Sequence, residues 1–181
     1  MFEIGDKIIY GNTGVCTVEK IGPLDSASGM GDRVYYTLNP YYVKESTIYT
    51  PVDNKKIVMR LVMNKEEAEQ LITEIPRIEA LWISDEKRRE QGYKDALATA
   101  DPRELIRVIK TIYPRKQERL AAGKKVTASD ERYFNMAEEF LYKEIAVSLE
   151  TTPEEAEQYI RQRMKKGKKN HETTKDNAAI D

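Results

Sequence analysis

Cysteine, histidine and tryptophan each occur only once in this chain of 181 residues. The single cysteine, Cys16, excludes an intramolecular disulfide and is typical of a reducing compartment. No stretch approaches the roughly 20 apolar residues that span a bilayer, and the N-terminus lacks the apolar run of a signal peptide. These absences predict a soluble, cytoplasmic protein with no membrane partner.

The same scarcity limits the chemistry that the chain can perform. His171 lies in a polar C-terminal tail, which argues against a nucleophile system of Ser/His/Asp or Cys/His type and against the usual zinc ligand sets. Neither a P-loop nor a G-x-G-x-x-G fingerprint is present. Cys16 stands between Val15 and Thr17 in a strand-like segment, which favours a buried, inert thiol. We therefore predict a binding protein that is not an enzyme and needs no cofactor or metal.

Residues 1–63 have the composition of short antiparallel strands. The strand-like segments, rich in Ile, Val, Tyr and Thr, are DKIIYGN, VCTVEKI, RVYYTLN and STIYTPV, with NKKIVMR as a fifth candidate. Turn-forming residues separate them, so we predict a small, strongly bent antiparallel barrel. The segment STIYTPV could pair with another sheet if it lies at an edge, or it could be fully paired inside its own barrel.

The pattern of capping residues and apolar positions in residues 64–166 predicts an all-helical domain of about five helices. Together with the predicted strands, this makes the fold class α+β. Helix starts are indicated by the capping residues Asn64, Ser84 or Asp85, Asp101, Thr127 or Ser129, and Thr152. We expect Pro114 to kink or end the third helix. The remaining residues, 167–181, are polar and aperiodic, which predicts a disordered tail.

The net charge of −1 conceals two blocks of opposite charge. Residues 82–125 hold twelve Lys and Arg against seven Asp and Glu, whereas residues 126–160 hold two against nine. The basic block could bind nucleic acid. The alternative, solvated helix faces joined by salt bridges, is the more common reason for such patterns.

The single tryptophan, Trp82, is open to two interpretations. Apolar neighbours on both sides favour a place in the core. Its position just before a helix start, with Arg88, Arg89 and Lys94 in the next turns, favours an exposed aromatic that wedges at a base step while cations hold phosphates.

Taken in order, these segments resemble those of a known family. The opening FEIGDKIIYGNTGVCTVEKI and the later STIYTPV resemble the RNA-polymerase-interacting domain of CarD-like bacterial transcription regulators, and the equivalent module of transcription-repair coupling factors is similar. The downstream segments DPRELIRVIKTIY and DERYFNMAEEFLYKEIA resemble the helical DNA-binding domain of CarD-like proteins. The resemblance covers residues 1–165 and implies a Tudor-like barrel followed by helices.

The resemblance also implies partners and site residues. The barrel would bind the β subunit of RNA polymerase through Thr47, Ile48, Tyr49, Thr50 and Pro51. The helical domain would lie on promoter DNA at the upstream fork of the bubble, where Trp82 would wedge into the minor groove and stabilise the open complex. The phosphate contacts, which are independent of DNA sequence, would come from Arg88, Arg89 and Lys94. Lys124 and Lys125 are further candidates that only the GKK stretch indicates. The protein would be a monomer that associates with the nucleoid through polymerase.

Two departures from the family pattern affect these expectations. Some relatives carry an arginine where this chain has Tyr49, so the contact with polymerase would be aromatic packing, or the docking chemistry would differ on both partners. The insertions ISDEK and EQG leave the register of the basic residues on the phosphates open. The alternative function is a protein–protein adaptor that binds polymerase or another sheet edge without contacting DNA, with Trp82 inside the helical core.

Overall fold

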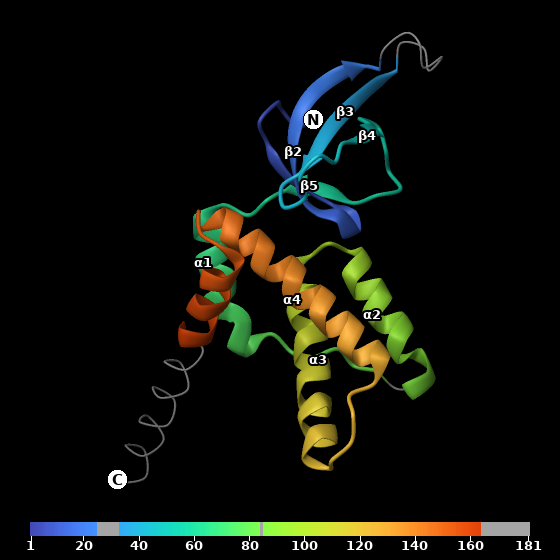
Figure 1. The fold of residues 1–181 in the computed structure, drawn as a ribbon, viewed down its shortest axis with the longest axis vertical. Coiled ribbons are helices and arrows are strands. Elements are labelled where there is room, and N and C mark those ends of the chain that lie inside the picture. Colours follow the sequence, from blue (N-terminus) through green and yellow to red (C-terminus); the bar gives the residue numbers. More distant parts are fainter. Residues whose placement is uncertain (25–32, 84, 164–181) are drawn as a thin grey trace.

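The N-terminal part of the chain forms one antiparallel sheet of five strands in the order β4-β3-β2-β1-β5 (Figure 1). The computed structural model describes residues 1–24, 33–83 and 85–163. The strands are β1 (Lys7–Tyr10), β2 (Gly14–Pro23), β3 (Val34–Pro40), β4 (Ile48–Pro51) and β5 (Met59–Leu61). All five overlap the predicted segments, and residues 25–32, between the second and third of these segments, lie outside the described residues.

The sheet curls around a single small core. Ile48 of β4 and Met59 of β5 belong to opposite edges of the sheet, yet both pack against the cluster that contains Ile8 and Leu38. A bulge between Val18 and Lys20 increases the bend of β2. The buried Cys16 belongs to this cluster, and burial raises the pKa of its thiol to about 11, as expected of an inert cysteine.

The rest of the described chain is helical, which confirms the predicted α+β class. The helices are α1 (Lys65–Glu74), α2 (Arg89–Ala98), α3 (Pro102–Ala121), α4 (Ala128–Ser148) and a last helix over residues 153–163. Asn64 forms the predicted capping box, in which its side chain accepts from the Glu67 N–H at 2.8 Å. The side chain of Asp101 likewise accepts from the Arg103 N–H at 2.8 Å and opens α3.

Pro114 was predicted to kink or end the third helix, and the second of these outcomes is wrong, because α3 continues through it to Ala121. The Pro114 ring is exposed, and the next residue, Arg115, is held by an ion pair to Asp130 of α4. Packing and this ion pair offset the loss of one helical hydrogen bond. The helix predicted to start at Ser84 or Asp85 begins with the 3-10 turn η4 (Glu86–Arg88), which Asp85 caps, and Ser84 lies outside the described residues. Residues 164–181, which contain the predicted end of the last helix, His171 and the predicted tail, also lie outside them.

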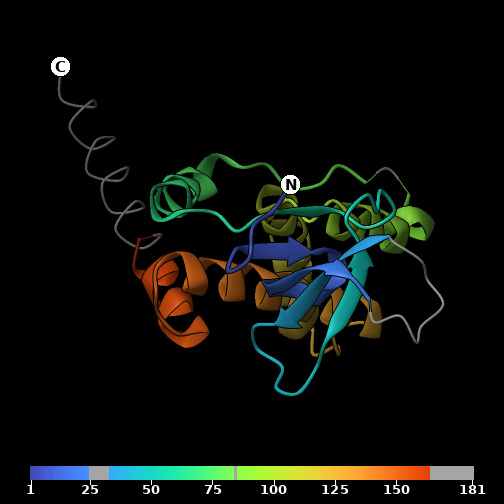
Figure 2. The ribbon, with the colours of Figure 1, turned by 90° about the horizontal axis from the view of Figure 1, so that it is seen from above.

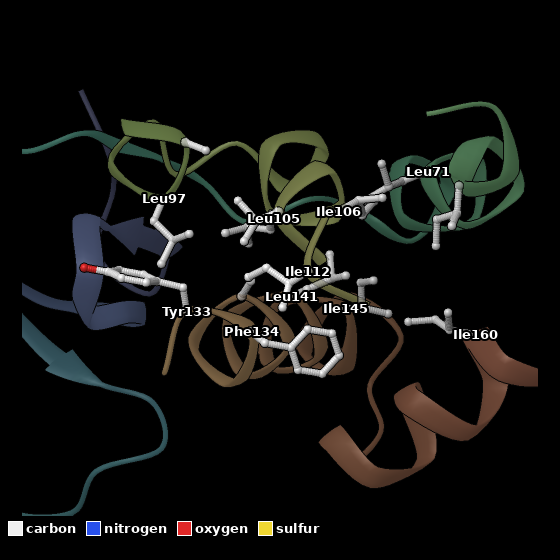
Figure 3. Packing of buried hydrophobic residues seen from close by; sticks show 14 of the residues in the cluster. Leu71, Leu97, Leu105, Ile106, Ile112, Tyr133, Phe134, Leu141, Ile145 and Ile160 are labelled. Carbon is white, nitrogen blue, oxygen red and sulfur yellow. The ribbon is translucent and has the colours of Figure 1, made fainter. Parts of the chain in front are cut away.

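The core of the helical domain lies between α3 and α4. Ile106 and Ile112 of α3 face Leu141 and Ile145 of α4 (Figure 3). Seen from above, α1 and residues 153–163 lie at one end of this pair and α2 lies at the other (Figure 2). The two longest helices therefore form the frame on which the remaining helices are placed.

The sheet and the helices share a small core of their own. Ile9 and Val15 of the sheet pack with Ala100 and Val147 of the helical domain. Next to this core, Tyr42 donates from its hydroxyl to the Lys143 carbonyl at 2.9 Å. These contacts fix the orientation of the sheet on α4.

Candidate nucleic-acid and polymerase interfaces

The side chain of Trp82 is 86% exposed, the largest exposure of any aromatic residue in the described chain. Its neighbours Leu81 and Ile83 are partly buried and pack against the helical core. Alternate residues of this segment therefore face inward, and Trp82 between them faces solvent. The interpretation that placed Trp82 in the core was wrong, because Leu81 and Ile83 supply the apolar contacts instead.

A shallow groove of about 460 Å³ lies beside the Trp82 ring. Ile83 and Gly92 line its apolar part, and an added Cβ on Gly92 would lie 3.5 Å from Ile83 Cδ1. Its polar part contains Arg88, Gln91 and Asp95, and Gln91 Nε2 donates to Asp95 Oδ1 at 2.7 Å. The indole can contact a base face and the Arg88 guanidinium can contact a phosphate, whereas the Asp95 carboxylate disfavours a phosphate on its side of the groove.

The three cations predicted near Trp82 are not equivalent. Arg89 forms an ion pair with Glu86 at 2.8 Å, and Lys94 forms one with Glu90 at 3.0 Å. The Arg88 side chain is exposed and has no ion pair among the described residues. Arg88 is therefore the cation most available for a phosphate, whereas Arg89 and Lys94 would first have to exchange a carboxylate.

A network of charges holds the start of α2 against α3 and α4. Glu86 pairs with Arg89 and also with Arg115 of α3, whose Nε donates to the buried Asp130 of α4 at 2.7 Å. The hydrogen bond from Arg89, supported by Arg115, lowers the pKa of the Glu86 carboxyl. Asp130 also accepts from the Tyr93 hydroxyl at 3.2 Å. The turn that carries Arg88 is thus fixed by contacts to two other helices.

Five of the twelve cations in the basic block form ion pairs with other described residues, namely Arg89, Lys94, Arg103, Arg107 and Arg115. The cations of this block that form no ion pair with another described residue are Lys87, Arg88, Lys110, Lys116, Arg119, Lys124 and Lys125. Apart from Lys110, they lie at the start of α2 or near the C-terminal end of α3, both at the end of the helical domain remote from the sheet (Figure 1). Lys124 and Lys125 are exposed in the loop after α3. The free positive charge is therefore concentrated at one end of the molecule.

The strand predicted to meet polymerase, β4, is an edge of the sheet. Within the described residues it pairs with β3 alone, so its other side presents main-chain groups. Tyr49 projects from it with 56% of its surface exposed. The edge position, which the sequence left open, allows β4 to pair with a strand of another protein.

The other residues of this segment differ in what they can offer a partner. Thr50 is 1% exposed as a whole residue, and its hydroxyl accepts from Asn54 Nδ2 at 2.9 Å, so it offers a partner almost no surface of its own. Thr47 is exposed, Ile48 and Pro51 are half-buried, and Pro51 has no N–H to donate. Any partner would therefore contact the side chains of Thr47 and Tyr49 and the main chain of the strand.

Several residues that hold the site were missed by the sequence analysis. Arg115 and Asp130 fix the turn before α2, but they are 15 residues apart in sequence and belong to different helices. Only Asp130 gave a signal in the sequence, because a carboxylate near the start of a helix with a largely apolar next turn can be buried and then needs a partner. Thr111 and Lys110, in the middle of α3, contact the segment before Trp82 and carried no signal at all.

Neither a metal site nor a membrane-spanning helix is found in the described part of the chain. No group of three or more His, Cys, Asp or Glu side chains there could hold a metal ion. No described helix combines the length and the apolar character needed to cross a bilayer.

The comparisons with known proteins identify both halves of the chain. Residues 2–63 match the CarD-like/TRCF RID domain, and residues 82–161 match the CarD C-terminal domain. No curated protein matches the chain. The two matches together define the class of the protein, a transcription regulator that interacts with RNA polymerase. The open edge of the sheet agrees with this class. The chain belongs to the CarD-like family.

Proposed function

We propose that this protein binds the β subunit of RNA polymerase through β4 and stabilises the open promoter complex by wedging Trp82 into the minor groove at the upstream fork of the bubble. The observation that carries the proposal is the exposure of Trp82, at 86%, on a segment whose neighbouring side chains are anchored in the core. The protein acts as a monomer, performs no catalysis and needs no cofactor.

The energetics favour a wedge that acts only on opened DNA. Unstacking a base step costs a few kcal/mol, and an aromatic ring that fits the opened step offsets part of that cost. A preference of about 1.4 kcal/mol for the open state shifts the ratio of open to closed complexes tenfold. The wedge therefore needs no large interface with DNA.

Arg88 contributes the main phosphate contact beside the wedge, and Lys124 and Lys125 extend the basic surface. Lys94 joins when a phosphate replaces Glu90, an exchange that costs little because exposed ion pairs are weak. Arg89 is held more firmly, because its side chain is only 22% exposed and its ion pair with Glu86 belongs to the network that fixes the start of α2. So few contacts give weak affinity for free DNA. Binding to polymerase through β4 supplies the effective concentration that the DNA contacts need.

The lifetime of promoter open complexes tests the proposal. We expect Trp82→Ala to shorten this lifetime severalfold at saturating protein, with unchanged affinity for polymerase. Tyr113→Ala is the matched control, because Tyr113 is an exposed aromatic (53%) on the same domain. Equal lifetimes with wild-type protein and Trp82→Ala would exclude the wedge and favour the adaptor, which binds polymerase without contacting DNA.

A further inference from the structure

The segment that leads to Trp82 is tied to the middle of α3 by two side chains. The main-chain N–H of Leu81 donates to Thr111 Oγ1 at 2.8 Å. Lys110, the preceding residue, donates from Nζ to the carbonyl oxygens of Ile75 and Ile78, the latter at 2.7 Å. Consecutive residues of one helix thus bind the segment on the N-terminal side of Trp82 at three main-chain positions.

The chemistry of Thr111 suits it to this role. A hydroxyl has one proton to donate and two lone pairs that accept. The Thr111 hydroxyl donates to the Arg107 carbonyl at 2.7 Å, which orients the oxygen so that it accepts from Leu81. Thr111 therefore connects the Trp82 segment to the hydrogen bonds of α3 itself.

Lys110 holds the same segment by charge. Ile75 is the C-cap of α1, and its carbonyl also accepts from the N–H of Ile78, which closes the turn that follows this helix. Carbonyls at the C-terminal end of a helix attract a cation. Burial lowers the pKa of the Lys110 ammonium, and no ion pair to it is found among the described residues. Its hydrogen bonds are thus made to the main chain of the segment rather than to a carboxylate.

The C-terminal side of Trp82 is anchored as well. Ile83 rests on Gly92 of α2, and Glu86 is bound by Arg115, which lies one helical turn beyond Thr111. The residues on both sides of Trp82 are therefore fixed, whereas the indole itself remains exposed.

We propose that Thr111 and Lys110 are positioning residues that hold Trp82 in its wedging orientation before DNA is met. The inference rests on the proposed function for its effect on DNA, but the order of the ring can be measured in the free protein. A ring that is already oriented loses less conformational entropy on binding than one on a loose loop. Loosening the segment therefore weakens the wedge without removing it.

Fluorescence provides the first test, because Trp82 is the only tryptophan in the chain. In the free, full-length protein we expect Thr111→Val to increase the amplitude of the subnanosecond anisotropy decay of Trp82, and Lys110→Met to do the same. Thr111→Ser keeps the hydroxyl and restores the wild-type decay. Thr73→Val is the matched control, because the Thr73 hydroxyl donates to its own helix at 3.0 Å in the same way without holding another segment.

Open-complex lifetime provides the second test, measured with RNA polymerase holoenzyme on a linear promoter fragment. Loss of one such hydrogen bond is expected to shorten the lifetime about two- to tenfold in Thr111→Val. The same substitution in a Trp82→Ala background should have no further effect, because Thr111 acts through the ring.

The outcomes separate this inference from the proposed function. An unchanged anisotropy decay in both Thr111→Val and Lys110→Met, with folding intact by circular dichroism, would overturn the positioning role. An equal shortening of the lifetime by Thr111→Val with and without Trp82 would overturn it as well. Failure of the proposed function is recognised separately, as a lifetime that Trp82→Ala leaves unchanged.

Discussion

Arg60 and Glu144 lie 84 residues apart in sequence and form a bidentate ion pair between the sheet and α4. Arg60 Nη1 lies 2.5 Å from Glu144 Oε1, and Nη2 lies 2.7 Å from Oε2. Glu144 is 1% exposed, and its carboxylate also accepts from the Met63 N–H at 3.2 Å. Arg60 in turn donates from Nε to the Ala100 carbonyl at 2.8 Å. One arginine thus connects β5, the connection between α2 and α3, and α4.

Removing one partner of this pair should destabilise the protein strongly. Arg60→Met leaves a buried carboxylate without its cation, which costs about 3–5 kcal/mol in the free energy of unfolding. The double variant Arg60→Met, Glu144→Met should recover most of that loss, because no charge then stays buried. Urea unfolding of both single variants and the double variant measures the coupling. Additive costs would show that the two side chains stabilise the protein independently.

Tyr49 should be the main side-chain contact of β4 with polymerase. We expect Tyr49→Ala to weaken binding to the β subunit at least about tenfold, since tyrosines at interfaces often contribute 2 kcal/mol or more. Tyr113→Ala, which removes an exposed tyrosine from the helical domain, should leave the affinity unchanged. Biolayer interferometry with immobilised β subunit compares the two. An equal effect of both variants would place the contact outside β4.

Arg88 should dominate the salt dependence of DNA binding. Arg88→Ala removes a cation that has no ion pair among the described residues, so the slope of log affinity against log salt should fall by about 1. Arg89→Ala and Lys94→Ala should change it less, because their ion pairs with Glu86 and Glu90 compete with phosphate.

Titrations with a forked promoter fragment, analysed by fluorescence anisotropy at several salt concentrations, measure these slopes. Lys20→Ala, which removes an exposed cation of the sheet, is the control. A larger change in slope for Lys94→Ala than for Arg88→Ala would contradict the order proposed for the three cations.

The ion pairs of Glu86 predict that the stability of the protein depends on pH. Its pKa is lowered in the folded protein, so its contribution is fully present above the unfolded pKa near 4.5 and is lost as the pH falls through the lower folded value. Glu86→Gln should therefore be less stable than the wild type at neutral pH, and the difference should shrink in acid. Chemical unfolding at a series of pH values tests this, and a difference that stays constant down to acid pH contradicts it.

Local signals in the sequence predicted most of the elements correctly. Asn64 and Asp101 open helices as capping residues should, because each cap depends on atoms no more than three residues away. The strands were found from β-branched and aromatic residues between turn formers, including GNT, which forms the turn between β1 and β2. Gly11 is required there, because its φ is +43° and an added Cβ would lie 2.8 Å from Ile57.

Features that depend on distant residues could not be predicted in this way. The exposure of Trp82 follows from the packing of Leu81 and Ile83, and nothing in their local sequence says which of three adjacent apolar side chains faces out. The position of β4 at an edge depends on the order of all five strands. The free charge of Arg88 depends on which carboxylates the other cations engage, and the ion pair of Arg115 with Glu86 spans 29 residues.

The number of residues from the start of α3 to Thr111 determines how far the Trp82 segment lies from the sheet. The helix begins at Pro102, two residues after the carbonyl that Arg60 holds, and it ties down the Trp82 segment at Thr111. At 1.5 Å per residue, about 13 Å of helix separates these two attachments. One added turn would lengthen that span by about 5 Å, and one added residue would rotate the second attachment by about 100°. The number of residues between Pro102 and Thr111 therefore sets both the distance of the indole from the sheet and the direction in which it points.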